Sequence, residues 1–246
     1  MGAVRDIIER GALEYGISLP ESAGAAFETY YSRLESRGRD INLTAVTGEQ
    51  DVARLHFLDS IALLKACDFT GESAARGGNG PRVVDVGSGA GFPGLPMKLA
   101  EPSIDLTLID ATGKRIAFLE ELCGALGVGA ACIHARAEEL SREPDMREQF
   151  DIAVSRAVAR LNVLCELILP FVMVGGLFLA MKGVDSAQEA AEAENAVKAL
   201  GARFEGNFDY TIPGTDVTHR VVIIRKVSAT PETYPRRFAR IEKSPL

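Results

Sequence analysis

The residues with the clearest chemical potential form a glycine-rich segment, Asp85 to Gly94, in which every second residue from Gly87 to Gly91 is glycine. The valines of Val83–Val86 predict a buried strand before it, and Pro93 suits the first turn of a following helix. Glycine lets the backbone approach a ligand closely, and the free N–H groups at a helix start favour an anionic group. The segment therefore predicts a site for a nucleotide-like cofactor.

Two classes of cofactor compete for this loop. Gly89 to Gly94 matches the G-x-G-x-x-G pattern of dinucleotide-binding loops, which favours NAD. The glycine run begins earlier, however, at Gly87, and Asp85 lies two residues before it. A carboxylate there is a poor neighbour for a pyrophosphate but tolerates the ammonium or sulfonium cation of S-adenosylmethionine. We favour the methyl donor over NAD, with a simple tight turn as the third interpretation.

Further candidates follow the ends of later strands, which meet at one edge of a parallel sheet. Asp110 ends the predicted strand 105–110, and its two carboxylate oxygens suit the two hydroxyls of a ribose. A solvated strand terminus is the alternative interpretation. Arg156 follows the fourth strand, where its guanidinium could bind the carboxylate of the donor, a phosphate of a substrate, or both in turn. The alternative interpretation is an arginine on the surface.

The predicted third strand leads to candidates for the adenine end of the donor. Ala137 and Glu138 follow this strand, and a backbone N–H and a carboxylate there would read the edge of the ring. Phe92 or Ala111 would pack on the face of the ring.

These residues need a sheet that brings the strand ends together. Strands and helices alternate from Val83 onward, which predicts an α/β fold with a doubly wound parallel sheet. The predicted strands are 83–86, 105–110, 130–135, 151–155 and 177–182, and the predicted helices are 96–100, 113–126, 160–172 and 185–200. Two later strands, 203–212 and 219–227, flank a Pro213–Asp216 turn and predict an antiparallel hairpin. This addition fits a Rossmann-like methyltransferase better than a dehydrogenase.

The chain divides into three predicted regions. Residues 1–70 form an N-terminal helical extension on the core, with amphipathic helices at 3–15 and 21–37 and a third at 49–66. Residues 70–81 are the predicted linker, 82–227 the core, and 228–246 a basic tail. In the third helix, His56 and Asp59 either pin the helical layer or take part in chemistry.

Composition excludes several classes of protein. The 246 residues carry a formal net charge of −7, which argues against a globally basic nucleic-acid binder but leaves room for local basic patches. Four scattered cysteines and three histidines lack metal-ligand spacing, so no metal site is expected. We expect a cytoplasmic protein, because no apolar stretch is long enough to span a bilayer and the start is too acidic for a signal peptide.

Eight segments of the chain together form a recognisable pattern: Asp85–Gly94, Gly113–Leu119, Ser155–Ala159, Lys182–Gly183, Tyr234–Arg237, Lys243–Pro245, Asn42–Ala45 and His56–Ser60. They resemble one bacterial family, the small-subunit ribosomal RNA methyltransferase G, also called glucose-inhibited division protein B. The stretch Phe238–Glu242 departs from the glycine- and proline-rich tail of the family.

The resemblance implies a class I S-adenosylmethionine-dependent methyltransferase fold and methylation of N7 of a guanine in 16S ribosomal RNA. It carries the cofactor positions to Gly87, Gly89, Phe92, Asp110, Ala111, Thr112, Ala137, Glu138 and Arg156. Guanine N7 presents a free lone pair, so no general base, and hence no catalytic residue of that kind, is expected.

RNA must be held in spite of the acidic net charge. Residues 218–246 carry seven basic side chains against two acidic ones, although a solvated tail is the alternative explanation. The predicted RNA contacts are Lys114, Arg115, Arg160, Lys182, Arg236 and Arg237. We expect a monomer whose partner is 16S ribosomal RNA or the small ribosomal subunit, with no membrane contact. The alternatives are an NAD-dependent oxidoreductase and a silent ribosome-binding module.

Overall fold

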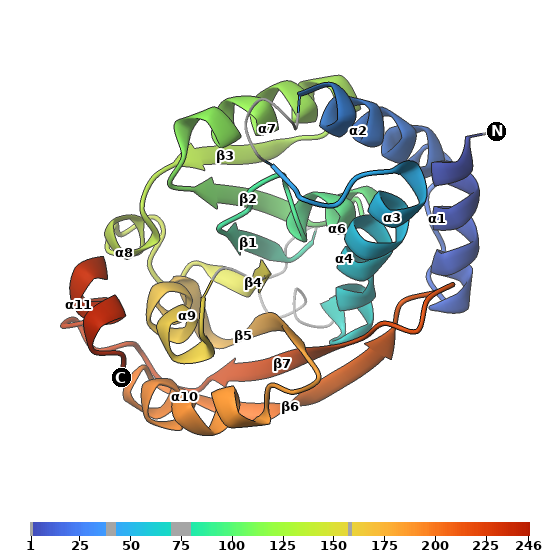
Figure 1. The fold of residues 1–246 in the computed structure, drawn as a ribbon. Coiled ribbons are helices and arrows are strands. Elements are labelled where there is room, and N and C mark those ends of the chain that lie inside the picture. Colours follow the sequence, from blue (N-terminus) through green and yellow to red (C-terminus); the bar gives the residue numbers. More distant parts are fainter. Residues whose placement is uncertain (1, 38–42, 70–79, 157–158) are drawn as a thin grey trace.

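The computed structural model describes residues 2–37, 43–69, 80–156 and 159–246, and in these residues seven strands form one sheet (Figure 1). The strands are β1 (Arg82–Val86), β2 (Asp105–Asp110), β3 (Ala130–His134), β4 (Phe150–Arg156), β5 (Val172–Gly183), β6 (Ala202–Thr211) and β7 (Thr218–Lys226). Their order is β3-β2-β1-β4-β5-β7-β6, and β7 runs antiparallel to both of its neighbours. The other pairs are parallel. The predicted doubly wound sheet with an antiparallel C-terminal hairpin is confirmed.

Helices cover both faces of the sheet (Figure 1). One face carries α1 (Ala3–Glu14), α2 (Ala23–Arg37), α3 (Glu49–Val52), η1 (Ala53–Leu58), α4 (Asp59–Ile61), η2 (Ala62–Lys65), α6 (Gly94–Ala100) and α7 (Gly113–Leu126). The other carries α8 (Ala137–Leu140), α9 (Leu161–Ile168), η3 (Leu169–Phe171) and α10 (Ala187–Ala199), with α11 (Phe238–Lys243) beside α9.

Alternation of side chains along β1 divides the interior into two hydrophobic cores. Val83 belongs to the core under α6 and α7, whereas Val84 and Val86 belong to the core under α9 and α10. Phe27 and Phe57 from the N-terminal helices share the first core with the sheet. The N-terminal helices are therefore packed on the sheet as one continuous interior.

Two predicted helices are less regular than their hydrophobic periodicity indicates. The stretch 49–66 is helical, but it widens to a π-helical turn at η1 and tightens to a 3-10 turn at η2. The carbonyl of Leu55, within η1, accepts a hydrogen bond from Arg156 at 3.3 Å. A partner about a hundred residues away thus contacts this turn, and local periodicity does not report such contacts.

The predicted helix 160–172 ends early, and β5 begins correspondingly early. α9 stops at Ile168 and a 3-10 turn follows, because Pro170 lacks an N–H and its ring crowds the preceding turn. β5 then starts at Val172 and runs through Gly175 and Gly176, where the pairing with β4 shifts register.

Some expectations fall outside the described residues. They concern Asn42 in the segment Asn42–Ala45, most of the predicted linker (70–79), and Ala157 and Val158 in the segment Ser155–Ala159. Within the part of the chain that is described, no helix has both the length and the apolar character needed to cross a bilayer.

Candidate cofactor site

The glycine loop joins β1 to α6 and is held to the end of β2. Gly87, Gly89 and Gly91 all adopt positive φ angles, which other residues rarely adopt. The N–H groups of Gly87 and Ser88 both donate to the carbonyl of Ile109, at 2.9 and 3.0 Å. The loop therefore lies across the tip of β2, beside Asp110.

Asp110 places a buried carboxylate at the end of β2. Its side chain is 4% exposed and accepts hydrogen bonds from the N–H of Gly89 at 3.0 Å and of Thr112 at 2.8 Å. Arg115 donates a third, at 3.3 Å. Each carboxylate oxygen has two lone pairs, so capacity remains for further hydroxyl donors. Asp110 thus fixes the loop and still faces the space beside it.

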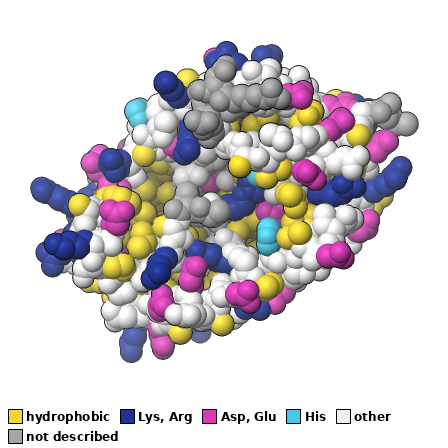
Figure 2. All heavy atoms as spheres, viewed as in Figure 1, with side chains coloured by type: hydrophobic (Ala, Val, Ile, Leu, Met, Phe, Trp, Pro, Cys, Tyr) yellow, Lys and Arg dark blue, Asp and Glu magenta, His cyan; other side chains and the backbone are white. Residues whose placement is uncertain are grey.

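That space is a cavity of about 220 Å³ at the carboxyl ends of β1, β2 and β3. Its wall is mainly apolar, with two carboxylates and one guanidinium. The lining residues are Val86, Gly87, Ile109, Asp110, Ala111, Ala135, Arg136, Ala137, Glu138, Ala159, Leu164, Leu167, Ile168 and Phe238. Figure 2 shows hydrophobic side chains gathered in a hollow on this face. An apolar slot with acceptor oxygens at its edge fits an adenosine, whose ring is flat and whose ribose donates hydrogen bonds.

The structure brings five of the predicted cofactor residues together in this lining: Gly87, Asp110, Ala111, Ala137 and Glu138. Gly89 and Thr112 reach it through their hydrogen bonds to Asp110. Phe92 and Arg156 do not line the cavity. Their assignment to the donor stays a prediction.

Phe92 points into an aromatic group formed with the N-terminal helices. Its ring stacks on Tyr30 with centroids 5.5 Å apart and on His56 at 4.5 Å, and the guanidinium of Arg156 lies 4.7 Å from its centroid. The ring of Phe92 therefore packs on the first core's side of the loop, whereas Ala111 lines the cavity.

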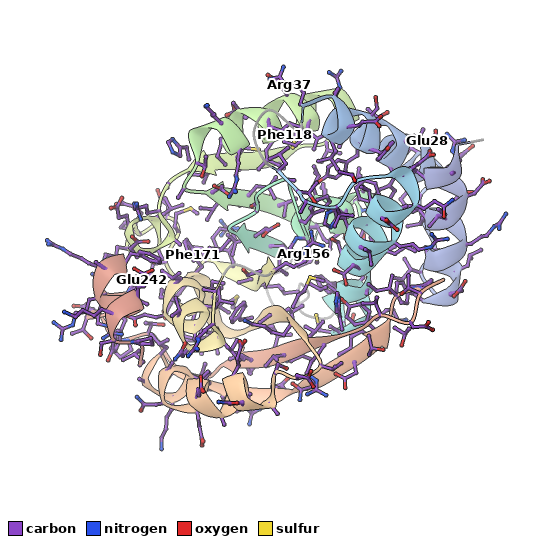
Figure 3. All side chains as sticks on the ribbon, in the orientation of Figure 1. Glu28, Arg37, Phe118, Arg156, Phe171 and Glu242 are labelled. Atoms are coloured by element: carbon purple, nitrogen blue, oxygen red, sulfur yellow. The ribbon has the colours of Figure 1, made fainter. Side chains whose placement is uncertain are left out.

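Arg156 lies between the sheet and α4 (Figure 3) and belongs to what we call the Asp59 cluster: His56, Asp59, Arg156, Tyr210 and His219. Buried Asp59 accepts from Arg156 at 3.2 Å, and from Tyr210 and His219 at 2.7 Å each. Of the two predicted roles for Asp59, the structure shows the pinning one, because this carboxylate ties α4 to β4, β6 and β7.

His56 is held at both ring nitrogens. Nε2 lies 2.6 Å from the Thr44 hydroxyl, and Nδ1 lies 3.1 Å from the Arg156 guanidinium. Burial, together with the nearby charge of Arg156, lowers the pKa of His56 to about 4. The imidazole is therefore neutral at neutral pH and already engaged.

Asp85 lies beneath the loop rather than in the cavity. Its Oδ2 accepts the N–H of Gly94 at 2.8 Å, and its Oδ1 is buried without a hydrogen-bond partner among the described residues. Burial raises the pKa of this carboxyl to about 7. Asp85 is not among the residues that line the cavity, because it alternates with Val86, which lines the cavity from the other face of β1. Its place next to the donor's cation stays a prediction.

Comparison with known proteins decides between the two cofactor classes. The family model described as rRNA small subunit methyltransferase G matches residues 24–207. A ribosomal RNA small subunit methyltransferase G from Pelotomaculum thermopropionicum is 44% identical over all of both chains. Another, from Alkaliphilus oremlandii, is 40% identical over 99% of each.

The chain belongs to the rRNA small subunit methyltransferase G family. Its donor is S-adenosylmethionine, so the NAD-dependent alternative is set aside. The fold agrees: a solved mitomycin 7-O-methyltransferase, 16% identical, superposes with a TM-score of 0.56 over 80% of this chain and 60% of its own.

Most of the predicted RNA contacts of this family member are engaged within the protein. Lys182 is 9% exposed and binds Glu189 at 2.7 Å. Arg236 forms a fork with buried Glu166, Arg115 binds Asp110, and Arg160 lies 3.7 Å from Glu192. Lys114 and Arg237 are exposed, and no ion pair of either occurs among the described residues. All six RNA contacts stay predictions, and Lys114 and Arg237 are the two without an ion pair among the described residues.

Sequence reasoning missed two features of the site. Phe238 reaches the cavity from the C-terminal segment, which was expected to contact RNA. Tyr210 and His219 join Asp59 from the hairpin. Tyr210 and His219 lie near strand ends, but a strand end alone does not indicate which distant helix it meets. Phe238 begins α11, and no local pattern indicated that it would reach the cavity.

Proposed function

We propose that this protein transfers a methyl group from S-adenosylmethionine to N7 of a guanine in 16S ribosomal RNA. The observation that supports this proposal most is the cavity with Asp110 and Glu138 at the strand ends, in a chain that matches a relative of the family over all of both sequences. The bound donor supplies an electrophilic methyl group on a sulfonium. Asp110 would accept the ribose hydroxyls, and Glu138 with the Ala137 backbone would read the adenine edge.

The proposed acceptor suits the groups that the site offers. Guanine N7 is a lone pair on the major-groove edge and needs no deprotonation before it attacks. Among the described lining residues there is no histidine, cysteine or lysine. His56, the nearest imidazole to the loop, is neutral and bonded at both nitrogens. The chain would therefore accelerate the reaction by alignment, a contribution on the order of 7 kcal/mol or more.

Arg156 remains a proposed contact of the donor's methionine half, and Phe92 remains a proposed contact of its adenine ring. Arg156 is the last residue of β4, and β4 pairs directly with β1, whose end carries the loop. Its guanidinium is already bonded to Asp59 and His56, so its orientation is fixed before any ligand arrives. A fixed guanidinium next to the loop supports a role in holding an anionic group.

We further propose that the protein works as a monomer in the cytoplasm, where ribosomal subunits are made. Lys114 and Arg237 would contact RNA phosphates close to the cavity, since Lys114 lies in the first turn of α7 soon after Asp110 and Arg237 precedes Phe238.

The test supplies purified protein with donor carrying a labelled methyl group and with either small ribosomal subunits or naked 16S RNA. Label should enter the RNA, and cleavage chemistry specific for N7-methylguanine should cut at one nucleotide. Heat-inactivated protein is the control. Donor binding without transfer to either substrate would contradict the proposal and favour a silent ribosome-binding module.

A further inference from the structure

The C-terminal segment 228–246 folds back onto the second core instead of extending into solvent. In Figure 1, α11 lies next to α8 and α9, close to the C-terminus. Arg147 binds the carbonyls of Thr230 at 2.9 Å and Tyr234 at 3.1 Å, and Arg142 binds that of Pro235. These guanidinium groups fasten the stretch that leads to α11.

A buried ion pair fixes the start of α11. Glu166 on α9 is 0% exposed and accepts the backbone N–H of Arg236 at 2.8 Å. The guanidinium of Arg236 forms two more bonds with it, at 2.8 and 2.6 Å. Such a pair of charge-assisted hydrogen bonds sets both the position and the direction of the chain at Arg236, where α11 is about to begin. α9 also presents Leu164 and Leu167 to the cavity, so the same helix lines the cavity and anchors its neighbour.

The Glu166–Arg236 ion pair places Phe238 beside the cavity. It is the first residue of α11 and one of the lining residues, yet it belongs to neither hydrophobic core. Ile241, one turn later, is fully buried and holds the helix in place. A partly exposed aromatic ring directed at an apolar cavity next to Ala111 and Ala137 is placed to meet a ligand.

We propose that Phe238 packs against the adenine ring of the bound donor, so that the C-terminal segment forms one wall of the cofactor site. The inference rests on the donor occupying this cavity, as the proposed function requires. Base stacking on an aromatic side chain is worth about ten- to a hundredfold in affinity. Glu166 acts as a positioning residue, because it orients the backbone directly before Phe238.

The first test measures donor and adenosine affinity by calorimetry. Phe238→Ala should weaken both by at least about tenfold, because the lost contact is to the adenine shared by the two ligands. Phe238→Tyr should bind like wild type. Arg240→Ala, an exposed change on the same helix, is the matched control and should have no effect. Melting curves without ligand separate loss of the contact from loss of folding.

The second test uses the absence of tryptophan from the sequence. Phe238→Trp provides a single reporter, whose fluorescence should be quenched by adenosine but not by free methionine. Arg240→Trp, exposed on the same helix, should show no response. If wild type binds the donor while Phe238→Ala binds it equally well and the Phe238→Trp signal is unchanged by adenosine, the inference is wrong. If wild type binds no donor at all, the proposed function itself fails.

Discussion

Asp110 combines two tasks in one carboxylate. It receives the N–H groups of Gly89 and Thr112 and also faces the cavity. Asp110→Asn should weaken donor binding at least about tenfold, because a neutral amide has one acceptor oxygen where the carboxylate has two, and charge-assisted bonds are the stronger kind. Calorimetry with the donor checks this. Asp105→Asn, at the opposite end of β2, should bind normally, and equal affinity for the Asp110 variant would refute the ribose assignment.

His219 makes stability depend on pH through its bond to Asp59. That bond raises the pKa of His219 above its ordinary value near 6.5. The folded state then holds the proton more tightly than the unfolded chain, so the stabilisation is complete below pH 6.5 and is lost as pH rises through the folded pKa. His219→Gln should lower the melting temperature most in acid, by no more than about 3 °C because the side chain is 34% exposed.

His56 makes stability depend on pH in the opposite direction to His219, so the two histidines can be compared within one protein. Burial lowers its pKa to about 4, so the wild-type protein loses this part of its stability as pH falls from 6.5 toward 4. The melting-temperature difference between wild type and His56→Gln should therefore shrink as the solution becomes more acidic. Parallel trends for the two histidine variants would contradict the assigned environments.

At the scale of elements, the loop between β1 and α6 depends on glycine at one position above all. Gly91 has a φ of 103°, and a Cβ there would lie 2.5 Å from the Tyr30 hydroxyl and 3.1 Å from Leu119. Gly91→Ala should destabilise the fold by at least about 1–3 kcal/mol, the cost of a strained backbone alone. Denaturant unfolding measures this.

Gly124→Ala is the matched control for the loop variant. Gly124 lies in α7, where an added Cβ meets nothing within 4 Å. Alanine there should leave stability unchanged or raise it by about 0.5–1 kcal/mol, because glycine weakens a helix interior. A Gly91→Ala protein as stable as the Gly124→Ala protein would show that the loop tolerates a side chain.

The elements that sequence predicts well are those set by neighbours in the chain. The β1 strand, the glycine loop, Asp110 at the end of β2 and the hairpin turn at Pro213–Asp216 all follow from local residue types. The placement of Phe92 and Arg156 and of the C-terminal segment depends on partners such as Asp59 and Glu166 far away in sequence. No local pattern distinguishes a basic residue that binds RNA from one that is paired with a buried carboxylate.

At the scale of the whole molecule, the N-terminal helices and the C-terminal segment are attached on opposite sides of the sheet edge that carries the cofactor cavity. The first core joins α1 and α2 to β1 and β2, whereas the second joins α9 and α10 to β4 and β5. The Asp59 cluster ties the N-terminal helices to the strand ends on one side, and the Glu166–Arg236 pair ties α11 to α9 on the other. The glycine loop itself is held by Tyr30 of α2, which donates to the carbonyl of Ala90 at 2.6 Å, and by the end of β2.

The net charge of −7 repels RNA as a whole, so binding must depend on local cations, and Lys114 and Arg237 are the two that we propose. Neutralising Lys114 and Arg237 together, by Lys114→Ala and Arg237→Ala, should weaken RNA binding and reduce the slope of log affinity against log salt by about 2, since each lost phosphate contact removes about one unit. Filter binding of 16S RNA fragments at several salt concentrations measures both quantities.

Donor affinity should stay unchanged, because neither side chain lines the cavity. Lys198→Ala, on exposed α10 away from that edge, is the control and should leave the slope unchanged. If the double variant keeps the wild-type slope, RNA is held elsewhere on the molecule, and these two cations have no part in its recognition.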